Sequence, residues 1–173
     1  MKSKNIYLQD ISRYGSNPNR FIKRFHWYFR KAQKEKNKLL SLYYKFMYKL
    51  TTQKHGLEIP YKTVIGKGLY LGHPYNITIN CSAILGDNVN IHKGATIGQE
   101  NRGSRQGTPI IGNKVWIGIN STIVGNITIG DDVLIAPNSF VNCNVPSHSI
   151  VFGNPCIIKH RDNATEGYIN NIV

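Results

Sequence analysis

The chain contains six histidines, and histidine is the side chain best suited to proton transfer at neutral pH because its ordinary pKa is about 6.5. His26 falls in a basic aromatic stretch, His148 in the turn VPSHSIV, and His160 beyond the last apolar repeat. We expect packing or surface roles for these three. His73 differs, because in LGHPYN the spacing of apolar residues lengthens from six to eight and a side chain there can leave a regular wall. His73 is therefore the first candidate for chemistry.

His92, in NIHKGATIG, directly follows an inward-facing position and should point outward, where it is either simply exposed or lines a groove between subunits. Coordination of a metal by His73, His92 and a third histidine is an alternative use of these side chains. No third histidine stands at a suitable position, so no metal is expected. The three cysteines are widely spaced without a CxxC pair, which favours neither a disulfide framework nor a zinc site. We interpret them as small core residues.

The elements that position these histidines are encoded by a repeat of six residues. Aliphatic side chains recur at this step, apart from one step of eight after Leu71 and one of fourteen after Ile97. The inward positions are Ile65, Leu71, Ile79, Leu85, Ile91, Ile97, Ile111, Ile117, Ile123, Ile129, Ile135 and Val141. A second inward set stands two places earlier and consists of Ala83, Val89, Ala95, Val115, Ser121, Ile127, Val133 and Ser139. This alternation is typical of short strands.

A short strand followed by a turn every six residues, with Gly, Asn and Asp at the turns, predicts a parallel β-helix. Twelve inward positions at three per coil make about four coils. An ordinary sandwich of short strands is the alternative, but its turns would recur about every 8 to 12 residues and not at a fixed step of six. The periodicity alone does not define the handedness of the helix.

The basic charge is concentrated before residue 56. Lys and Arg number 22 against 9 Asp and Glu, and residues 1–55 hold 14 of the basic and 2 of the acidic side chains. Residues 20–50 mix aromatic and basic side chains without Gly or Pro, which predicts one or two helices with Ser16 or Asn17 as the N-cap. Such a segment could cap the first coil, dock on an anionic membrane or lipid-linked glycan, or pack against a partner. We favour the cap, and nothing beyond charge favours nucleic acid.

We expect three regions along the chain: a basic helical segment at 1–55, a β-helix at 56–160 with an excursion loop at 99–109, and a C-terminal tail at 161–173. The sequence has no uninterrupted apolar stretch of about 18 residues and no secretory signal pattern. We therefore expect a soluble cytoplasmic protein, with peripheral contact at the inner face of the membrane as a role for the basic segment.

The segments VIGKGLYLGH, AILGDNVNIHKGATIGQ and PIIGNKVWIGINSTIVGNITIGDDVLIAPNSFV, with the ending NVPSHSIVFGNP, resemble the hexapeptide-repeat acyltransferases. The resemblance covers about residues 55–160 and is strongest to the serine acetyltransferase branch, which includes capsule and exopolysaccharide O-acetyltransferases. It implies a left-handed parallel β-helix, a homotrimer with active sites between subunits, and acetyl-CoA as the acetyl donor.

The resemblance also implies roles for individual residues. His73 holds the position of the catalytic histidine, and Glu58, fifteen residues earlier, that of the carboxylate which orients it. A solvated turn residue is the alternative for Glu58, and we favour the orienting role. The residues expected beside the donor are Gln99, Gly118, Ile119 and Pro137. Lys159 and Arg161 either meet its phosphates or are ordinary exposed charges.

The excursion loop carries the main departure from the serine acetyltransferases. Where those enzymes have an Arg-His pair that helps to hold the amino acid, this chain has Gly107 and Thr108. Together with Arg105 and His92, they suit a sugar hydroxyl better than a free amino acid. We therefore expect transfer of acetyl to a saccharide such as a capsular polysaccharide, an exopolysaccharide or O-antigen, by direct attack with His73 as base. The alternatives are a serine O-acetyltransferase of cysteine synthesis and a non-catalytic β-helical scaffold or membrane-docking partner.

Overall fold

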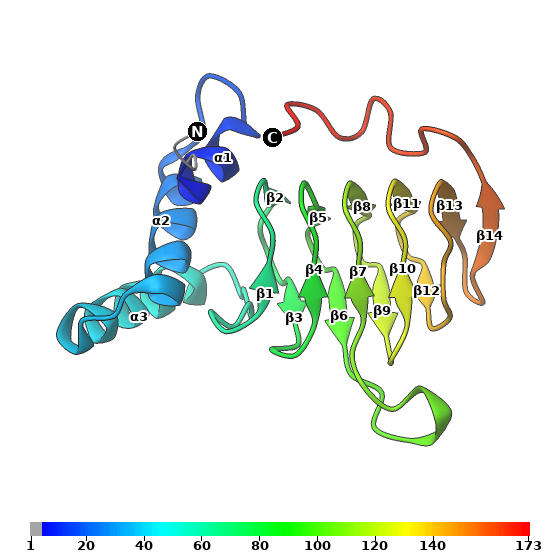
Figure 1. Ribbon diagram of the computed structural model, residues 1–173, viewed down its shortest axis with the longest axis horizontal. Coiled ribbons are helices and arrows are strands. Elements are labelled where there is room, and N and C mark those ends of the chain that lie inside the picture. The colour runs from blue at the N-terminus through cyan, green and yellow to red at the C-terminus, as the bar shows by residue number, and fades with distance from the viewer. Residues whose placement is uncertain (1–4) are drawn as a thin grey trace.

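The computed structural model describes residues 5–173 as a solenoid of short strands with three helices at one end (Figure 1). Residues 1–4 of the expected N-terminal segment lie outside the described residues. The strands form three parallel sheets, one per face of the solenoid, and a final antiparallel strand extends the second sheet. The first sheet holds β1 (Val64–Ile65), β4 (Ile84–Leu85), β7 (Ile110–Ile111) and β10 (Thr128–Ile129).

The second sheet holds β2 (Tyr70–Gly72), β5 (Asn90–His92), β8 (Val115–Ile117), β11 (Val133–Ile135), β13 (Ser149–Phe152) and the antiparallel β14 (Ile157–His160). The third sheet holds β3 (Thr78–Ile79), β6 (Thr96–Gly98), β9 (Thr122–Val124) and β12 (Phe140–Val141). The predicted β-helix is confirmed, because strands far apart in sequence pair in parallel register between successive coils.

The solenoid has about five coils rather than the predicted four. The three additional rungs are Glu58, which bridges Thr78, Val145, which bridges Ile129, and β13, which pairs with β11. The hexad pattern omits the first rung because proline, not a small residue, follows Ile59. It omits the two rungs at Val145 and β13 because the spacing of six ends at Val141, and Val145 follows after only four residues. All the inward positions predicted from the repeat are buried, so the repeat identifies the core correctly.

Asparagine recurs at the turns because the backbone there enters the left-handed region. Asn88, Asn120 and Asn138 have φ between 57° and 58°, a conformation that asparagine tolerates better than most side chains. The cysteines also fall in turns or bends rather than at inward positions. Cys81 and Cys143 are exposed and Cys156 is half-buried, so the expectation that they are core residues was wrong.

Three helices precede the solenoid: α1 (Ile6–Ser12), α2 (Arg20–Lys34) and α3 (Lys38–Gln53). The expected N-cap at Ser16 or Asn17 is wrong by two or three residues, because Asn19 accepts a hydrogen bond from the Ile22 amide and caps α2. Phe25, Phe29 and Tyr48 belong to the same buried cluster as the solenoid core. The helices therefore cover the open end of the first coil.

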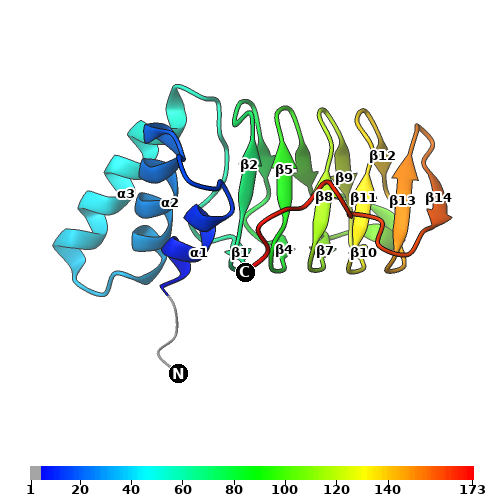
Figure 2. The same ribbon diagram turned by 90° about the horizontal axis from the view of Figure 1, so that it is seen from above.

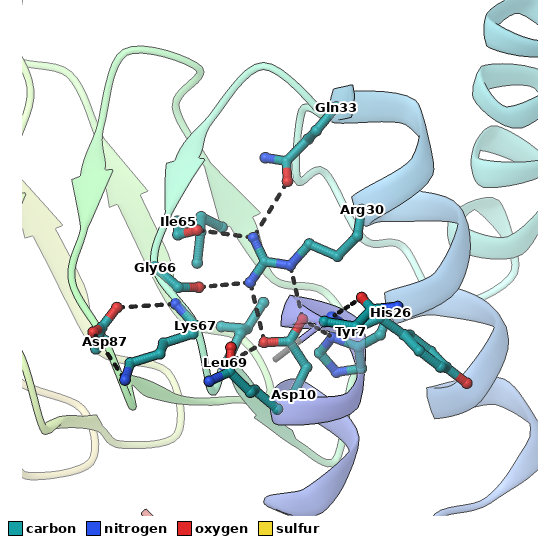
Figure 3. A network of polar contacts seen from close by, with 12 residues as sticks. Tyr7, Asp10, His26, Arg30, Gln33, Ile65, Gly66, Lys67, Leu69 and Asp87 are labelled. Atoms are coloured by element: carbon teal, nitrogen blue, oxygen red, sulfur yellow. Dashed lines mark hydrogen bonds and ion pairs between the residues drawn. The ribbon is translucent and has the colours of Figure 1, made fainter. Parts of the chain in front are cut away.

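A buried polar network joins the helices to the solenoid (Figure 3). The Arg30 guanidinium donates to both carboxylate oxygens of Asp10, at 2.7 and 3.1 Å, and to the carbonyl oxygens of Ile65 and Gly66. The Asp10 carboxylate also accepts from the Leu69 amide. Nδ1 of His26 lies 3.4 Å from the Asp10 carboxylate, without good hydrogen-bond alignment. The network fixes α1, which carries Asp10, and α2, which carries Arg30, to the first coil.

The expected C-terminal tail is an ordered segment that runs back along the outer face of the second sheet (Figure 2). Asn88 exchanges two hydrogen bonds with the backbone of Val173, and the Asn90 amide donates to the carbonyl oxygen of Tyr168. Within residues 5–173, no helix is both long enough and apolar enough to cross a bilayer.

Candidate active site

His73 stands in the turn between β2 and β3, with a backbone φ of 52° that takes its exposed side chain out of the regular wall. This turn is held from outside by His55, whose ring stacks on both Phe21 and Tyr75, at centroid distances of 3.7 and 4.5 Å. Nδ1 of His55 also lies 3.1 Å from the carbonyl oxygen of Pro74. The register break seen in the sequence is therefore a structured turn.

A cavity of about 440 Å³ opens beside His73 and includes Tyr14, Tyr70 and His92 among its walls. His92 on β5 is the register partner of Gly72 on β2 in the second sheet. The centre of its ring lies 4.6 Å from that of the Trp116 ring. Burial, with a smaller contribution from nearby His73, lowers the pKa of His92 below its ordinary value, so that its imidazole is neutral at neutral pH. The structure thus brings His73 and His92 together.

Glu58 lies on the edge of the third sheet. Its amide donates to the carbonyl oxygen of Ile77, and its carboxylate accepts a long hydrogen bond of 3.4 Å from the Thr78 hydroxyl. Among the ion pairs and hydrogen bonds of the described residues, none joins Glu58 to His73. Glu58 lines the groove between α3 and the third sheet, whereas His73 lines the cavity beside the second.

Of the residues expected beside the donor, Gly118, Ile119 and Pro137 lie along the corner that begins at His73, whereas Gln99 lies at the corner of the excursion loop. Backbone hydrogen bonds link this corner from coil to coil: Lys93 donates to Gly72, Asn120 to Lys93, and Asn138 to Ile119. Gly118 packs so closely that a Cβ would meet the nitrogen of Pro137 at 2.6 Å.

Beyond the last coil, the Lys159 ammonium lies 5.7 Å from the ring centre of Phe152. With strands about 4.8 Å apart, the four steps between the first and last coil span about 19 Å. The row of turns is straight and ends at a cation, so it fits a long, thin ligand with phosphates at one end.

The excursion loop leaves the solenoid at a different corner, between β6 and β7, and projects away from its body (Figure 1). Its base is closed by two hydrogen bonds between Glu100 and Gly107, and Thr108 donates to the carbonyl oxygen of Ser82. Arg105 lies in the short helix η1 (Gly103–Arg105) and, like Gln99, is exposed. Within one chain, these residues and His73 lie at different corners.

The backbone conformation at position 107 explains why a glycine stands there. Gly107 has a φ of 136°, which side chains other than glycine rarely adopt, and a Cβ there would approach Cβ of Asn126 to 2.9 Å. An arginine at this position would require a different loop base.

Sequence reasoning missed Tyr14 and Tyr70 as walls of the cavity beside His73. Tyr14 precedes the helices that the aromatic pattern predicts, and it reaches the cavity because its hydroxyl accepts from the Leu71 amide and contacts Nε2 of His26. No local signal marks this long-range contact. Within residues 5–173, no three His, Cys, Asp or Glu side chains come together as a candidate metal site.

Comparison with known proteins identifies the repeat. Residues 108–145 match the family model described as bacterial transferase hexapeptide (six repeats). The chain is 37% identical over 125 residues to serine acetyltransferase 4 of Arabidopsis thaliana, covering 72% of this chain and 34% of that protein. It is 37% identical over 112 residues to a serine acetyltransferase of Staphylococcus aureus, covering 65% of this chain and 53% of that protein.

Solved structures share the fold. A serine acetyltransferase from Brucella abortus strain S19 aligns with a TM-score of 0.72 at 24% identity, over 92% of this chain and 69% of that chain. A serine acetyltransferase in complex with CoA aligns with a TM-score of 0.62 at 25% identity, over 80% and 55% of the two chains. The chain spans between about a third and about a half of the length of the two sequence relatives, at 34% and 53%.

Proposed function

The chain is a hexapeptide-repeat protein of the transferase family with serine acetyltransferase homologues, and on this premise we propose that it is an acetyl-CoA-dependent O-acetyltransferase. The observation that carries the proposal is the placement of His73. It leaves the wall at a left-handed turn, faces a cavity shared with His92, and stands at the head of a straight row of turns.

In the proposed reaction, His73 acts as the general base. The acceptor oxygen attacks the carbonyl carbon of the thioester while the hydroxyl proton passes to His73. The carbon–sulfur bond then breaks, the imidazolium returns its proton to the departing sulfur, and the products are an acetyl ester and a free thiol. A neutral His92 close by adds no positive charge that would oppose formation of the imidazolium.

Glu58 is proposed to stabilise that imidazolium from the neighbouring rung. Its contact with Thr78 is long, at 3.4 Å, and its side chain is exposed, so little opposes a change of rotamer. Replacing Glu58 with Gln keeps the size and removes the charge. If Glu58 orients the base, this change lowers kcat with little effect on KM for either substrate.

The donor is proposed to lie along the corner row. Gly118, Ile119 and Pro137 would contact the pantetheine arm and Lys159 the phosphates, and Gln99 would reach the arm from the loop corner of a neighbouring subunit. The straight row of about five coils and the exposed Lys159 at its end support this placement, and a related serine acetyltransferase has been solved with CoA. Replacing Lys159 with Ala should raise KM for acetyl-CoA and leave kcat unchanged.

For the acceptor, the comparisons favour L-serine over a saccharide, because the sequence relatives compared above are both serine acetyltransferases. The acceptor is thus a hydroxyl compound, with L-serine as the first candidate. The saccharide remains a second candidate on one observation. The backbone of Gly107 does not accommodate the arginine that would hold an amino acid, while Thr108 offers a neutral hydroxyl beside the open loop.

A homotrimer is proposed for the complete site. Gln99, Arg105, Gly107 and Thr108 project from one corner and His73 from another, so these groups would meet only if the loop of one subunit reached the cavity of the next. Light scattering coupled to size-exclusion chromatography would test this proposal. Three subunits per particle would support it, and a monomer with full activity would contradict it.

Peripheral membrane contact is proposed for α3. One stripe of this helix is apolar and exposed, with Leu39, Leu42 and Phe46 at 80%, 68% and 58% exposure, and lysines flank the stripe. An apolar stripe bordered by lysines suits an anionic lipid surface. Co-sedimentation with vesicles of anionic phosphatidylglycerol should exceed that with phosphatidylcholine. Phe46→Glu should abolish binding to the anionic vesicles. The matched control is Tyr75→Glu, at an exposed aromatic residue outside α3, which should leave binding unchanged.

The decisive experiment measures release of free thiol from acetyl-CoA, with L-serine in one reaction and surface-polysaccharide fragments in another. Turnover should fall by at least about 100-fold in His73→Ala, with thermal stability and oligomeric state unchanged. His160→Ala is the matched control, because this histidine is exposed and lies beyond the last coil. Equal loss in both variants, or none in His73→Ala, would refute the assignment, and the second result is expected of a scaffold.

A further inference from the structure

A second cavity, of about 340 Å³, lies between the outer face of the second sheet and the C-terminal segment that crosses it. Its walls come from three distant parts of the chain: Arg13 after α1, Trp116 on the sheet, and Tyr168 and Asn170 on the C-terminal segment. It adjoins the cavity beside His73, with which it shares Tyr14, Tyr70 and His92. A ligand could therefore occupy both cavities at once.

Arg13 provides a buried positive charge at this site. Its side chain is only 3% exposed, and its two terminal nitrogens donate to the amide oxygens of Asn88 and Asn90, which are neutral. Its Nε has no hydrogen-bond partner. None of the ion pairs found within residues 5–173 involves Arg13. Asp10 acts on Arg13 electrostatically but forms no ion pair with it, since its carboxylate is bound by Arg30. A buried guanidinium that lacks an ion-paired carboxylate is costly, so the cavity favours an anionic occupant.

Aromatic rings form much of the remaining wall. Trp116 and Tyr168 meet edge to face at 5.2 Å, and Tyr14 stacks on Tyr70 at 4.5 Å. Nε2 of His92 is buried without a hydrogen-bond partner. The C–H faces of a sugar ring pack well on aromatic side chains, and the cavity volume is at the size of a small-molecule site. The combination of a cation and aromatic rings suits a sugar that carries a carboxylate.

We propose that this cavity binds the carboxylate-bearing ring of an acidic sugar, with the carboxylate toward Arg13, the ring against Trp116 and Tyr168, and a hydroxyl directed toward His73. The proposal rests on the proposed acetyl transfer and on its second candidate acceptor, the saccharide, which it narrows to an acidic sugar. Arg13 and the aromatic residues bind and orient the sugar, and the transfer chemistry stays with His73.

The chain offers a direct reporter of binding, because Trp116 in the cavity is one of only two tryptophans. In a Trp27→Phe background, fluorescence reports Trp116 alone. Titration with sodium glucuronate, without acetyl-CoA, should give a saturable change, and glucose should bind about tenfold more weakly because it lacks the charge. Glucose binding as tightly as glucuronate would overturn the proposal. So would a response to L-serine and none to glucuronate.

Substitutions then test the location. Arg13→Gln should abolish the response, but Arg13 is buried and the variant could fail to fold. Asn170→Asp avoids this difficulty, because Asn170 is exposed and can change without disturbing the core. The substitution adds a negative charge at the rim of the cavity. It should weaken glucuronate binding by about fivefold or more. The matched control is Asn163→Asp, the same change on the same segment but outside this cavity, which should leave binding unchanged. Equal effects of both changes would overturn the proposal.

The two proposals can fail separately. Glucuronate binding without acetyl transfer to any acceptor would leave the site intact and refute the acetyltransferase. Acetyl transfer that depends on His73, with no glucuronate response in the fluorescence assay, would refute the acidic-sugar site and leave the acetyltransferase intact.

Discussion

The imidazole of His92 lies directly against Gly72 on the neighbouring strand. A Cβ at position 72 would come within 2.4 Å of both Nδ1 and Cε1 of His92. The absence of a side chain at Gly72 therefore sets the position of a ring that lines both the cavity beside His73 and the cavity at Arg13.

Replacing Gly72 with Ala should push the His92 ring outward and disturb both cavities. We expect kcat/KM for acetyl transfer to fall by about 10- to 100-fold, since displacements of about 1 Å near a reacting group have effects of this size. The free energy of unfolding should also fall. If the contact with His92 is the cause, adding His92→Ala should restore most of the lost stability, measured by urea unfolding in a double-mutant cycle.

Replacing Arg30 with Met should loosen the helices from the solenoid. The change leaves the buried Asp10 carboxylate without its guanidinium partner and frees the carbonyl oxygens of Ile65 and Gly66. Removing one member of a buried ion pair costs about 3 to 5 kcal/mol of unfolding free energy. Arg24→Met is the control, because Arg24 is exposed on the same helix. Similar stability of both variants by urea unfolding would contradict the role of the network.

The stability of the protein should decrease as the pH falls below about 6.5. Burial lowers the pKa of His26 below its ordinary value despite the nearby Asp10, so the folded protein holds this imidazole neutral while the unfolded chain protonates it. Unfolding then takes up a proton, and the free energy of unfolding falls by at most about 1.4 kcal/mol per pH unit until the folded pKa is reached.

The pKa of Asp10 acts in a separate, more acidic range. Burial raises it, but the contacts with His26 and Arg30 outweigh burial and hold it below 3.8, so the stability that Asp10 provides is lost only below that pH. Unfolding of wild type and His26→Gln at pH 7.5, 6.5 and 5.5 or so would distinguish the two groups. The same slope in both proteins would show that His26 does not cause the loss.

Replacing Gly107 with Ala should open the base of the excursion loop, because the φ of 136° and the close Cβ of Asn126 disfavour any side chain there. Trypsin should then cut the loop at Arg102 or Arg105 about tenfold faster than in the wild type, because a larger fraction of the molecules would have the loop open at any moment. Ser104→Ala is the control within the loop, since Ser104 is exposed and its backbone does not lie in the left-handed region. Equal cleavage of the two variants would contradict the special role of Gly107.

The sequence alone determined the solenoid and its core. A parallel β-helix repeats one local unit, so the inward positions from Ile65 to Val141 follow from spacing and alternation without knowledge of distant contacts. For the same reason, the break in spacing at His73 marked a turn that leaves the wall. The coil count was one short because the rungs at Glu58 and Val145 depart from the hexad pattern.

Only the tertiary structure decided which groups surround that turn. Arg13, Tyr14 and Tyr168 belong to segments without repeats, and they reach the second sheet through hydrogen bonds to residues more than fifty positions away. The partner of Glu58 is Thr78, on the next coil. Such contacts depend on how the two ends of the chain fold back over the solenoid, and the energy of a buried charge depends on everything packed around it, which no local pattern encodes.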